Sequence, residues 1–337
     1  DYRYLVGEMS ALRSLLLYFA MDSDGVKTHT EQALNLTAPE LGIERVLARL
    51  TLAGSQQMAG ELNDAYTTIN LGFDEEQYQS DALKASVLLT ACYLGWLSAD
   101  LRTLQQNAAQ VVNLSQEQNS PGMLAFGHYF LGMVSYHQND LSAAKTHFSF
   151  VHKRPYTAYD DSFIYSNCGL ALTFQAMGRE NEALEVVEGV VDYLMKTGNS
   201  EMLLIIQAFQ AELALRQEQL TLASQWANRI IPLLPLMPMP FFYAPHKTLA
   251  KVLLAENTPA SQEKAAASLV ELKEFLEFTH NGVHLIETLA LLALYHEMKG
   301  EHAAALKTIK QALTLGLPGR FIRVFADLGP DMEKLLS

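Results

Sequence analysis

The stretch LIETLALLALYHEMKGEHAAALKTIKQALTL, residues 285–315, decides the fold of this chain. Apolar residues recur at the three- and four-residue spacing of amphipathic helices on both sides of a short turn at Gly300. Small residues lie seven positions before this glycine and five and twelve positions after it, at Ala293, Ala305 and Ala312. Such small side chains allow two helices to approach closely, so the stretch predicts a helical hairpin.

The same pattern recurs upstream through almost the whole chain. Aligned by their turns, the units have turn residues at Met21, Gly60, Ala99, Asn139, Gly178, Glu218, Asn257 and Gly300. Successive turns are 39 or 40 residues apart, except for a last step of 43, and the residue seven positions before each turn is always small. Because each hairpin leaves an apolar face that only a neighbour can cover, we predict an all-α superhelical solenoid of about eight repeats. The pattern is similar to the tetratricopeptide (TPR) repeat, whose period of about 34 residues is shorter.

We expect residues 1–337 to form a single TPR-like domain, with residues 316–337 as a C-terminal capping helix. One segment interrupts the helical repeat pattern. Residues 231–245, IPLLPLMPMPFFYAP, hold five prolines and cannot continue a helix. We interpret this segment as an extended connection between the sixth and seventh repeats. Packing against its own repeats is the favoured arrangement, and exposure to a partner is the alternative.

Composition limits the class of protein. The net charge of −13 argues against direct contact of this chain with nucleic acid, which needs clustered Lys and Arg. No apolar run is long enough to span a membrane, and Cys92 and Cys168 fit no metal or redox spacing, so we expect a cytoplasmic protein without membrane contact. The chain begins at Asp1, within a helical pattern, and we interpret it as a fragment of a larger protein.

The first helix of each repeat is expected to line a concave binding surface. In repeats three to five the inward positions are aromatic, and we predict that they bind a ligand: Tyr93, Trp96, Phe126, Tyr129, Tyr136, His137 and Tyr165. Aromatic faces with polar tips suit a sugar, a planar metabolite or a peptide. In repeats six to eight the inward positions are charged and include a secondary groove of Arg216, Lys247 and Lys251, together with Glu212, Glu287 and Glu297. Ordinary packing is the alternative for each aromatic residue, and a solvated face is the favoured interpretation of the charged set.

Catalytic and metal-binding patterns are absent from the sequence. Gly25-Val26-Lys27-Thr28 lacks the earlier glycine of a phosphate-binding loop. His280 and His284 share one helix face but have no third ligand at a fixed offset. We therefore predict no enzyme activity, no catalytic residues and no metal site.

The C-terminal stretch carries a specific resemblance. GRFIRVFADLG, residues 319–329, continues to Met332, Leu335 and Leu336. It is similar to the end of the repeat array in the large ATP-dependent, LuxR-type transcription regulators of the MalT-like STAND family. Gly7-Glu8 and Ala11-Leu12-Arg13 resemble the opening of that array.

This resemblance implies a signal-sensing domain between an upstream nucleotide-binding module and a downstream DNA-binding domain. ATP is then expected in the upstream module, and no cofactor in this fragment. The expected partner is a small inducer or a regulatory protein on the concave face, with possible self-association. The alternative is a general TPR-type scaffold for protein–protein interaction with no small-molecule ligand.

Within the C-terminal stretch we expect the apolar residues to pack on the last repeat. Arg323 and Asp327 lie four residues apart on one helix and are expected to form an ion pair.

Overall fold

The computed structural model describes residues 2–37, 42–74, 81–229, 236 and 241–337. Every regular element among these residues is a helix, which confirms the predicted all-α, TPR-like repeat class. The chain divides into two compact units, unit 1 with residues 1–127 and 278–281 and unit 2 with residues 128–277 and 282–337. The single uninterrupted array over residues 1–337 stays a prediction.

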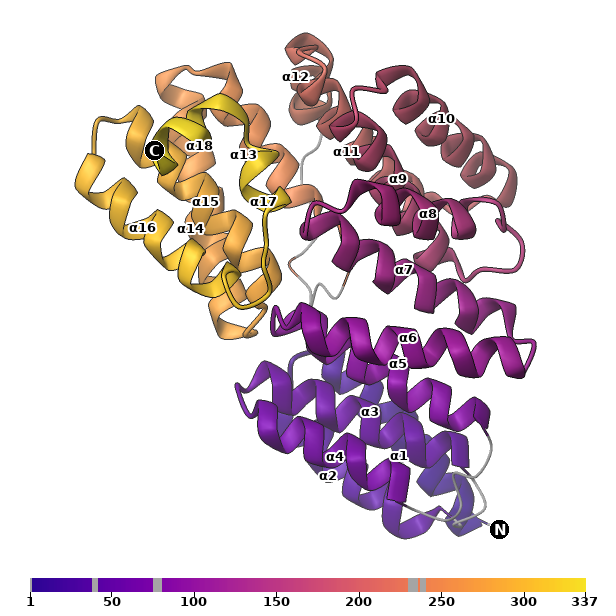
Figure 1. The fold of residues 1–337 in the computed structure, drawn as a ribbon. Helices are drawn as coiled ribbons and strands as arrows, with labels where there is room; N and C mark the ends of the chain where they lie inside the picture. Colours follow the sequence, from indigo (N-terminus) through magenta and orange to yellow (C-terminus); the bar gives the residue numbers. More distant parts are fainter. Residues whose placement is uncertain (1, 38–41, 75–80, 230–235, 237–240) are drawn as a thin grey trace. The chain divides into compact units, whose positions relative to one another are not determined.

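The first seven helices begin in unit 1, and α7 continues past its boundary. They are α1 (Tyr2–Phe19), α2 (Ser23–Leu36), α3 (Gly42–Met58), α4 (Leu62–Asp74), α5 (Asp81–Leu97), α6 (Leu101–Glu117) and α7 (Pro121–His137). The others are α8 (Leu141–His152), α9 (Asp160–Ala176), α10 (Glu180–Thr197), α11 (Ser200–Arg216), α12 (Leu220–Arg229), α13 (Pro245–Glu256), α14 (Pro259–Phe278), α15 (Gly282–Met298), α16 (His302–Gly316), α17 (Arg323–Ala326) and α18 (Gly329–Leu336). Successive helices lie side by side as pairs in α1 and α2, α3 and α4, α5 and α6, α9 and α10, α11 and α12, and α15 and α16, the last of which Figure 1 shows.

The turns within these pairs lie at the predicted positions. All eight predicted turn residues have positive φ, from 52° at Asn257 to 80° at Gly60. At Asn139, for example, the backbone N–H donates to Tyr136 O at 2.9 Å, and the N–H of Asp140 donates to Ser135 O at 2.8 Å. These two bonds satisfy carbonyls at the end of the helix and form a left-handed C-cap. The chain therefore reverses at each turn because one residue adopts the left-handed conformation.

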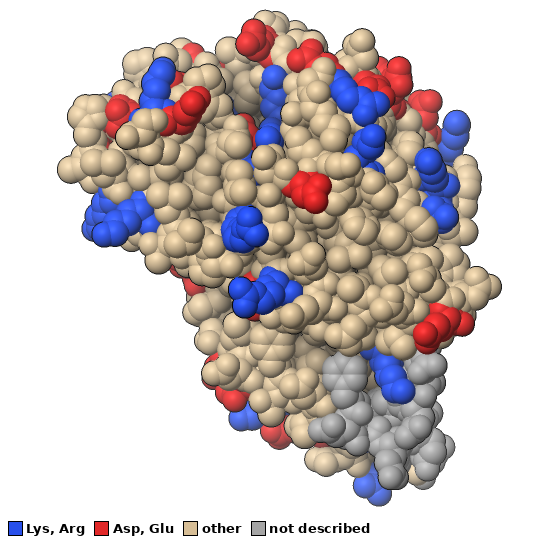
Figure 2. All heavy atoms as spheres, in the orientation of Figure 1, with Lys and Arg blue, Asp and Glu red and all other residues tan. Residues whose placement is uncertain are grey.

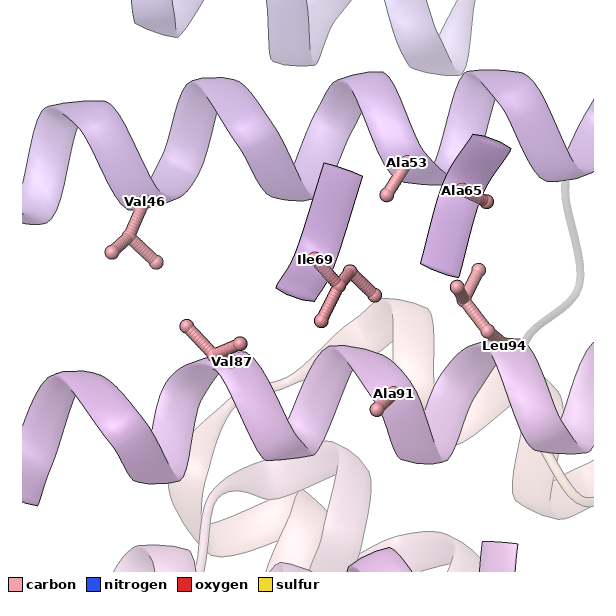
Figure 3. Packing of buried hydrophobic residues seen from close by; sticks show 7 residues of the cluster. All are labelled: Val46, Ala53, Ala65, Ile69, Val87, Ala91 and Leu94. Atoms are coloured by element: carbon pink, nitrogen blue, oxygen red, sulfur yellow. The ribbon is translucent and has the colours of Figure 1, made fainter. Parts of the chain in front are cut away.

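Small side chains bring the paired helices together, as predicted. In unit 1, Ala53 of α3 and Ala65 of α4 are fully buried and pack with Ile69 and with Val87 and Ala91 of α5, as Figure 3 shows. The apolar side chains of three helices point into one shared layer. The hairpin of α3 and α4 is thus covered by α5 of the next hairpin, as in other helical repeats.

Glycine replaces alanine where a large ring needs the space. A Cβ on Gly132 of α7 would lie 2.5 Å from Phe148 Cε1, and a Cβ on Gly169 of α9 would lie 2.4 Å from Phe148 Cζ. The ring of Phe148 therefore lies between two helices that approach it through their backbones.

The C-terminal stretch of unit 2 consists of two short helices, α17 and α18, where the sequence predicted one capping helix over residues 316–337. α17 ends at Ala326, and α18 starts at Gly329, at φ 75°, with Pro330 in its first turn, where proline is tolerated. Phe321 and Met332 are buried, as predicted, and the backbone N–H of Ile322 donates to His137 O at 2.7 Å. This C-terminal segment is fixed against the end of α7.

Two surface properties follow from the described residues. None of their helices combines the length and the apolar run required to cross a bilayer. On the face drawn in Figure 2, Lys and Arg side chains are scattered among uncharged residues, whereas contact with phosphate backbones needs clustered basic residues. That this domain makes no contact with nucleic acid stays a prediction.

Candidate functional site

A large pocket lies within unit 2, with a volume of about 1130 Å³. Its walls come from α9, α11, α13, α15 and α16 and from the C-terminal segment with α17 and α18. The large apolar side chains of the lining are Leu215, Leu254, Leu291, Leu294, Met298, Leu306, Leu328 and Leu335. The pocket is large enough for a small molecule, since such sites span about 300 to 1,000 Å³.

Helical spacing places charged side chains on the floor of this pocket, with Glu212, Arg216 and Lys251, and behind it, with Lys247 and Glu287. Glu212 and Arg216 are four residues apart on α11, as are Lys247 and Lys251 on α13, so each pair shares one helix face. Glu287 is contributed by α15. The floor is therefore assembled from helices that are distant in sequence.

Glu212 is the centre of the network. Its Oε1 accepts from Arg216 Nε and from Lys251 Nζ, both at 2.8 Å, and its Oε2 accepts from Thr248 Oγ1 at 2.8 Å. Lys251 also pairs with Glu287 Oε1 at 2.7 Å, and Lys247 pairs with the other oxygen of the same carboxylate. Two carboxylates thus bridge α11, α13 and α15.

The C-terminal segment joins the network through Asp327. Its Oδ2 lies 3.4 Å from Arg216 Nη1 and accepts from Tyr136 Oη at 2.5 Å, and its Oδ1 pairs with Arg323. The pair between Arg323 and Asp327 confirms the prediction from their spacing. The sequence did not indicate that Asp327 also contacts Arg216 and Tyr136.

Burial makes these charges interdependent. The side chain of Glu212 is only 3% exposed and that of Asp327 8%. Burial alone would raise the pKa of Glu212, but Lys251 and Arg216 outweigh it and hold that pKa at about 2. Burial lowers the pKa of Lys247, and Glu287 offsets part of the effect. A buried ion network is stable only when every charge keeps its partners.

Two histidines next to the network are neutral at pH 7. Burial lowers the pKa of His137 to about 4 and that of His284 further, and the charge of Lys247 acts in the same direction. Behind the network lies a void of about 40 Å³, lined partly by Tyr136, Tyr243 and Lys247. A void of this size, with polar groups on its wall, is large enough for a water molecule.

The environment of these charged residues therefore differs from the predicted one. The interpretation as a solvated face is wrong for Glu212 and Lys247, which are buried because ion pairs replace their hydration. Of the predicted secondary groove, Arg216 and Lys251 line the large pocket, whereas Lys247 faces the smaller void. Glu297 lies at the rim of the pocket and pairs with His302 at 2.9 Å. Charged residues at four-residue spacing, Glu212 with Arg216 and Lys247 with Lys251, were the available sequence signal.

The predicted aromatic residues are divided between the units, with Tyr93, Trp96 and Phe126 in unit 1 and Tyr129, Tyr136, His137 and Tyr165 in unit 2. All except Tyr93, which is half-buried, are buried. Their role in ligand binding stays a prediction.

Residues from the end of the proline-rich segment cover the aromatic residues of unit 2. Phe241 stacks on Tyr165 with ring centroids 4.7 Å apart. Phe242 contacts the ring of Tyr136, and its backbone N–H donates to Tyr129 Oη at 3.0 Å. Residues 241–244 thus pack on their own repeats, as favoured from the sequence, while 231–235 and 237–240 lie outside the described residues.

His280 and His284 do not share a helix face as expected, because His280 precedes α15 and only His284 lies in it. His280, in unit 1, contacts Met58 O through Nδ1 at 3.0 Å, and His284, in unit 2, contacts Phe241 O through Nε2 at 2.9 Å. Among the described residues there is no group of three or more side chains that could hold a metal ion.

Comparison with known families identifies the domain. The family model for the MalT-like TPR region matches residues 7–337, and no curated protein sequence matches the chain significantly. All-helical repeat domains of this type are generally non-catalytic scaffolds. The chain belongs to the MalT-like TPR family, the helical repeat sensor and interaction domains of LuxR-type STAND transcription regulators.

Proposed function

We propose that this domain senses a small effector in the pocket of unit 2 and acts without catalysis in a cytoplasmic regulator. The observation that carries the proposal is the composition of the pocket wall, in which α11, α13 and α15 face the C-terminal segment across about 1130 Å³. A ligand there would contact the repeats and the C-terminal segment together. The ATP expected for this family would then bind in an upstream module.

The mechanism is a shift in the position of the C-terminal segment. Asp327 holds this segment through Arg216 and Tyr136. A ligand favours one position of the segment only by its difference in affinity for the two positions. Through that difference, binding in the pocket would be communicated to whatever follows the repeats.

A thermal-shift screen, combined with a pocket variant, tests whether the effector binds in the pocket of unit 2. A ligand at a hundred times its Kd adds about 2.7 kcal/mol of stability, which raises Tm by roughly 5 to 10 °C in a unit of this size. Ala255 is exposed on α13 and lines the pocket, so Ala255→Trp narrows the pocket without disturbing the core. We expect this variant to weaken effector binding at least tenfold.

Ala267→Trp is the matched control, because Ala267 is exposed on α14 and does not line the pocket. Equal loss of binding in both variants, or in neither, would place the effector elsewhere. The predicted aromatic set would then be the next candidate.

The second candidate function is protein interaction, here self-association. One face of α1 exposes Leu5, Met9, Leu12 and Leu16, with between 51% and 70% of each residue exposed. Their spacing of three and four residues forms a continuous apolar stripe. Concentration-dependent sedimentation that is lost in Leu12→Asp, together with a negative ligand screen, would favour this function.

A further inference from the structure

We propose that the pocket of unit 2 takes an organic anion with an apolar body. Its carboxylate or phosphate group pairs with Arg216, Lys251 and Arg323, and its body lies against the leucines of α13, α15 and α16. This inference rests on the proposed function and names the class of its ligand.

The positive and negative charges at the pocket floor do not balance. Three cations line the floor, Arg216, Lys251 and Arg323, and only two carboxylates accompany them, Glu212 and Asp327. Lys247 and Glu287 lie behind the floor, where Glu287 pairs with Lys247 and also with Lys251, so that floor and network together hold four cations and three carboxylates. One positive charge is therefore in excess at the floor of a pocket in a chain whose net charge is −13.

The rim of the pocket does not cancel this excess effectively. Glu297 pairs with His302, and Asp331 pairs with Lys334, both at 2.9 Å. These side chains are between 39% and 81% exposed, whereas those of the three floor cations are at most 15% exposed. Solvent and salt screen the exposed charges much more than the buried ones.

Hydrogen-bond donors also exceed acceptors at the floor. Arg216 pairs through Nε with Glu212 and through Nη1 with Asp327, which leaves Nη2 without an acceptor among the described residues. Arg323 Nε is buried and has no acceptor within the described part of the chain. Arginine carries five N–H groups and accepts nothing, so the missing partner is an acceptor.

The remaining wall of the pocket is apolar and therefore favours an apolar body in the ligand. Leu254 of α13, Leu291 and Leu294 of α15 and Leu306 of α16 present an apolar surface beside the charged floor. A polar ligand with charge all around would leave this surface unused, and a neutral apolar one would leave the excess positive charge of the floor without a counter-charge. A single anionic head on an apolar body satisfies both parts.

Matched compounds test the class with the complete chain. The probes are 4-phenylbutyrate against its amide, and hexyl phosphate against hexanol, each titrated by calorimetry and thermal shift. Charge-assisted hydrogen bonds are about twice as strong as neutral ones, so we expect each anion to bind at least about tenfold more tightly than its neutral counterpart. The carboxylate and phosphate arms show which head group the floor prefers.

A variant pair locates the anion. Ala255 lies one helical turn after Lys251 on the pocket wall and is exposed. Ala255→Glu adds a negative charge beside the floor, and Ala255→Gln adds nearly the same shape without charge. We expect Ala255→Glu to bind the anions at least fivefold more weakly than Ala255→Gln does, and the two variants to bind the neutral compounds equally within twofold. Arg216→Gln gives a second measurement, with a loss of at least tenfold for the anions.

The outcomes separate this inference from the proposed function. Neutral compounds that bind as tightly as the anions, and whose binding is lost in Ala255→Trp, would overturn the anion class and leave the effector pocket intact. Anion binding that is equal in Ala255→Glu and Ala255→Gln would also overturn the inference, because the anion would then bind away from the floor. Absence of binding by every compound at about 10 mM would count against both proposals.

Discussion

Replacing Glu212 by glutamine tests the ion network directly. The substitution keeps the size of the side chain but removes the charge that accepts from Arg216 and Lys251. The pKa of Glu212 falls from an ordinary value of 4.5 to about 2 in the folded protein. Since one pKa unit corresponds to 1.36 kcal/mol, ionisation of this group contributes about 3 kcal/mol of stability at pH 7. Loss of one partner of a buried pair is expected to cost a similar amount.

The sign of the pH dependence follows from the lowered pKa. A carboxyl whose pKa is depressed on folding stabilises the protein above its unfolded pKa of about 4.5, and this stability is lost as the pH falls towards 2. We therefore expect Glu212→Gln to cost about 3 kcal/mol at pH 7 and only about 1 kcal/mol at pH 3. The difference in cost between pH 7 and pH 3 arises from the lost charge, because the shape of the side chain is nearly the same at both pH values.

Urea unfolding monitored in unit 2 is the assay. Trp226, on α12, packs against Ala211 and Ala223 in unit 2, while Trp96 belongs to unit 1. In a Trp96→Phe background the remaining tryptophan reports on unit 2 alone. Glu201→Gln, at an exposed position of α11, is the control and should change the stability by less than about 0.5 kcal/mol. A cost below about 1 kcal/mol at pH 7, or the same cost at both pH values, would refute the argument for the network.

Three further predictions concern packing and helix ends, each measured as a change in the free energy of unfolding. Gly132→Ala should cost about 1 to 3 kcal/mol, because its Cβ would overlap the ring of Phe148, whereas Gly189→Ala, where nothing lies within 4 Å, should stabilise α10 by about 0.5 to 1 kcal/mol. A loss at Gly189 as large as that at Gly132 would contradict the packing argument. Glu218→Gly should stabilise unit 2 by about 0.5 to 1 kcal/mol, since Glu218 has a φ of 60° that glycine adopts without strain, and a destabilised variant would contradict this. Asp140→Ala should cost about 1 kcal/mol, because the side chain accepts from Ala143 N at the start of α8, and Asp140→Asn should retain most of that stability.

The repeat period could be predicted because its signals are local. Each hairpin contains both signals, a small residue and, seven positions later, a turn residue such as Gly60, Asn139 or Gly300. The spacing between the two is visible in the sequence. The same turns have positive φ even where the residue is Met21 or Ala99. The alignment identified these less typical turns because the period is regular.

The candidate site could be predicted only in part because its contacts are not local. Arg216 and Lys251 were recognised as groove residues, but Lys251 pairs with Glu212 and Glu287 on other helices, and the contact between Tyr136 and Asp327 spans 191 residues. A charge pattern on one helix does not reveal which opposite charge faces it. For the same reason, the sequence did not indicate that Phe242 covers Tyr136.

The bond between Tyr136 and Asp327 cannot form until the ribosome has made almost the whole chain. At a translation rate of about 5 to 20 residues per second, the partner of Tyr136 is made roughly 10 to 40 s after it. Until then the carboxylate that meets Tyr136 and Arg216 does not exist, and the end of α7 exposes surface that the finished protein buries. The early repeats of unit 2 therefore keep part of their final buried surface exposed until the C-terminal segment has been made.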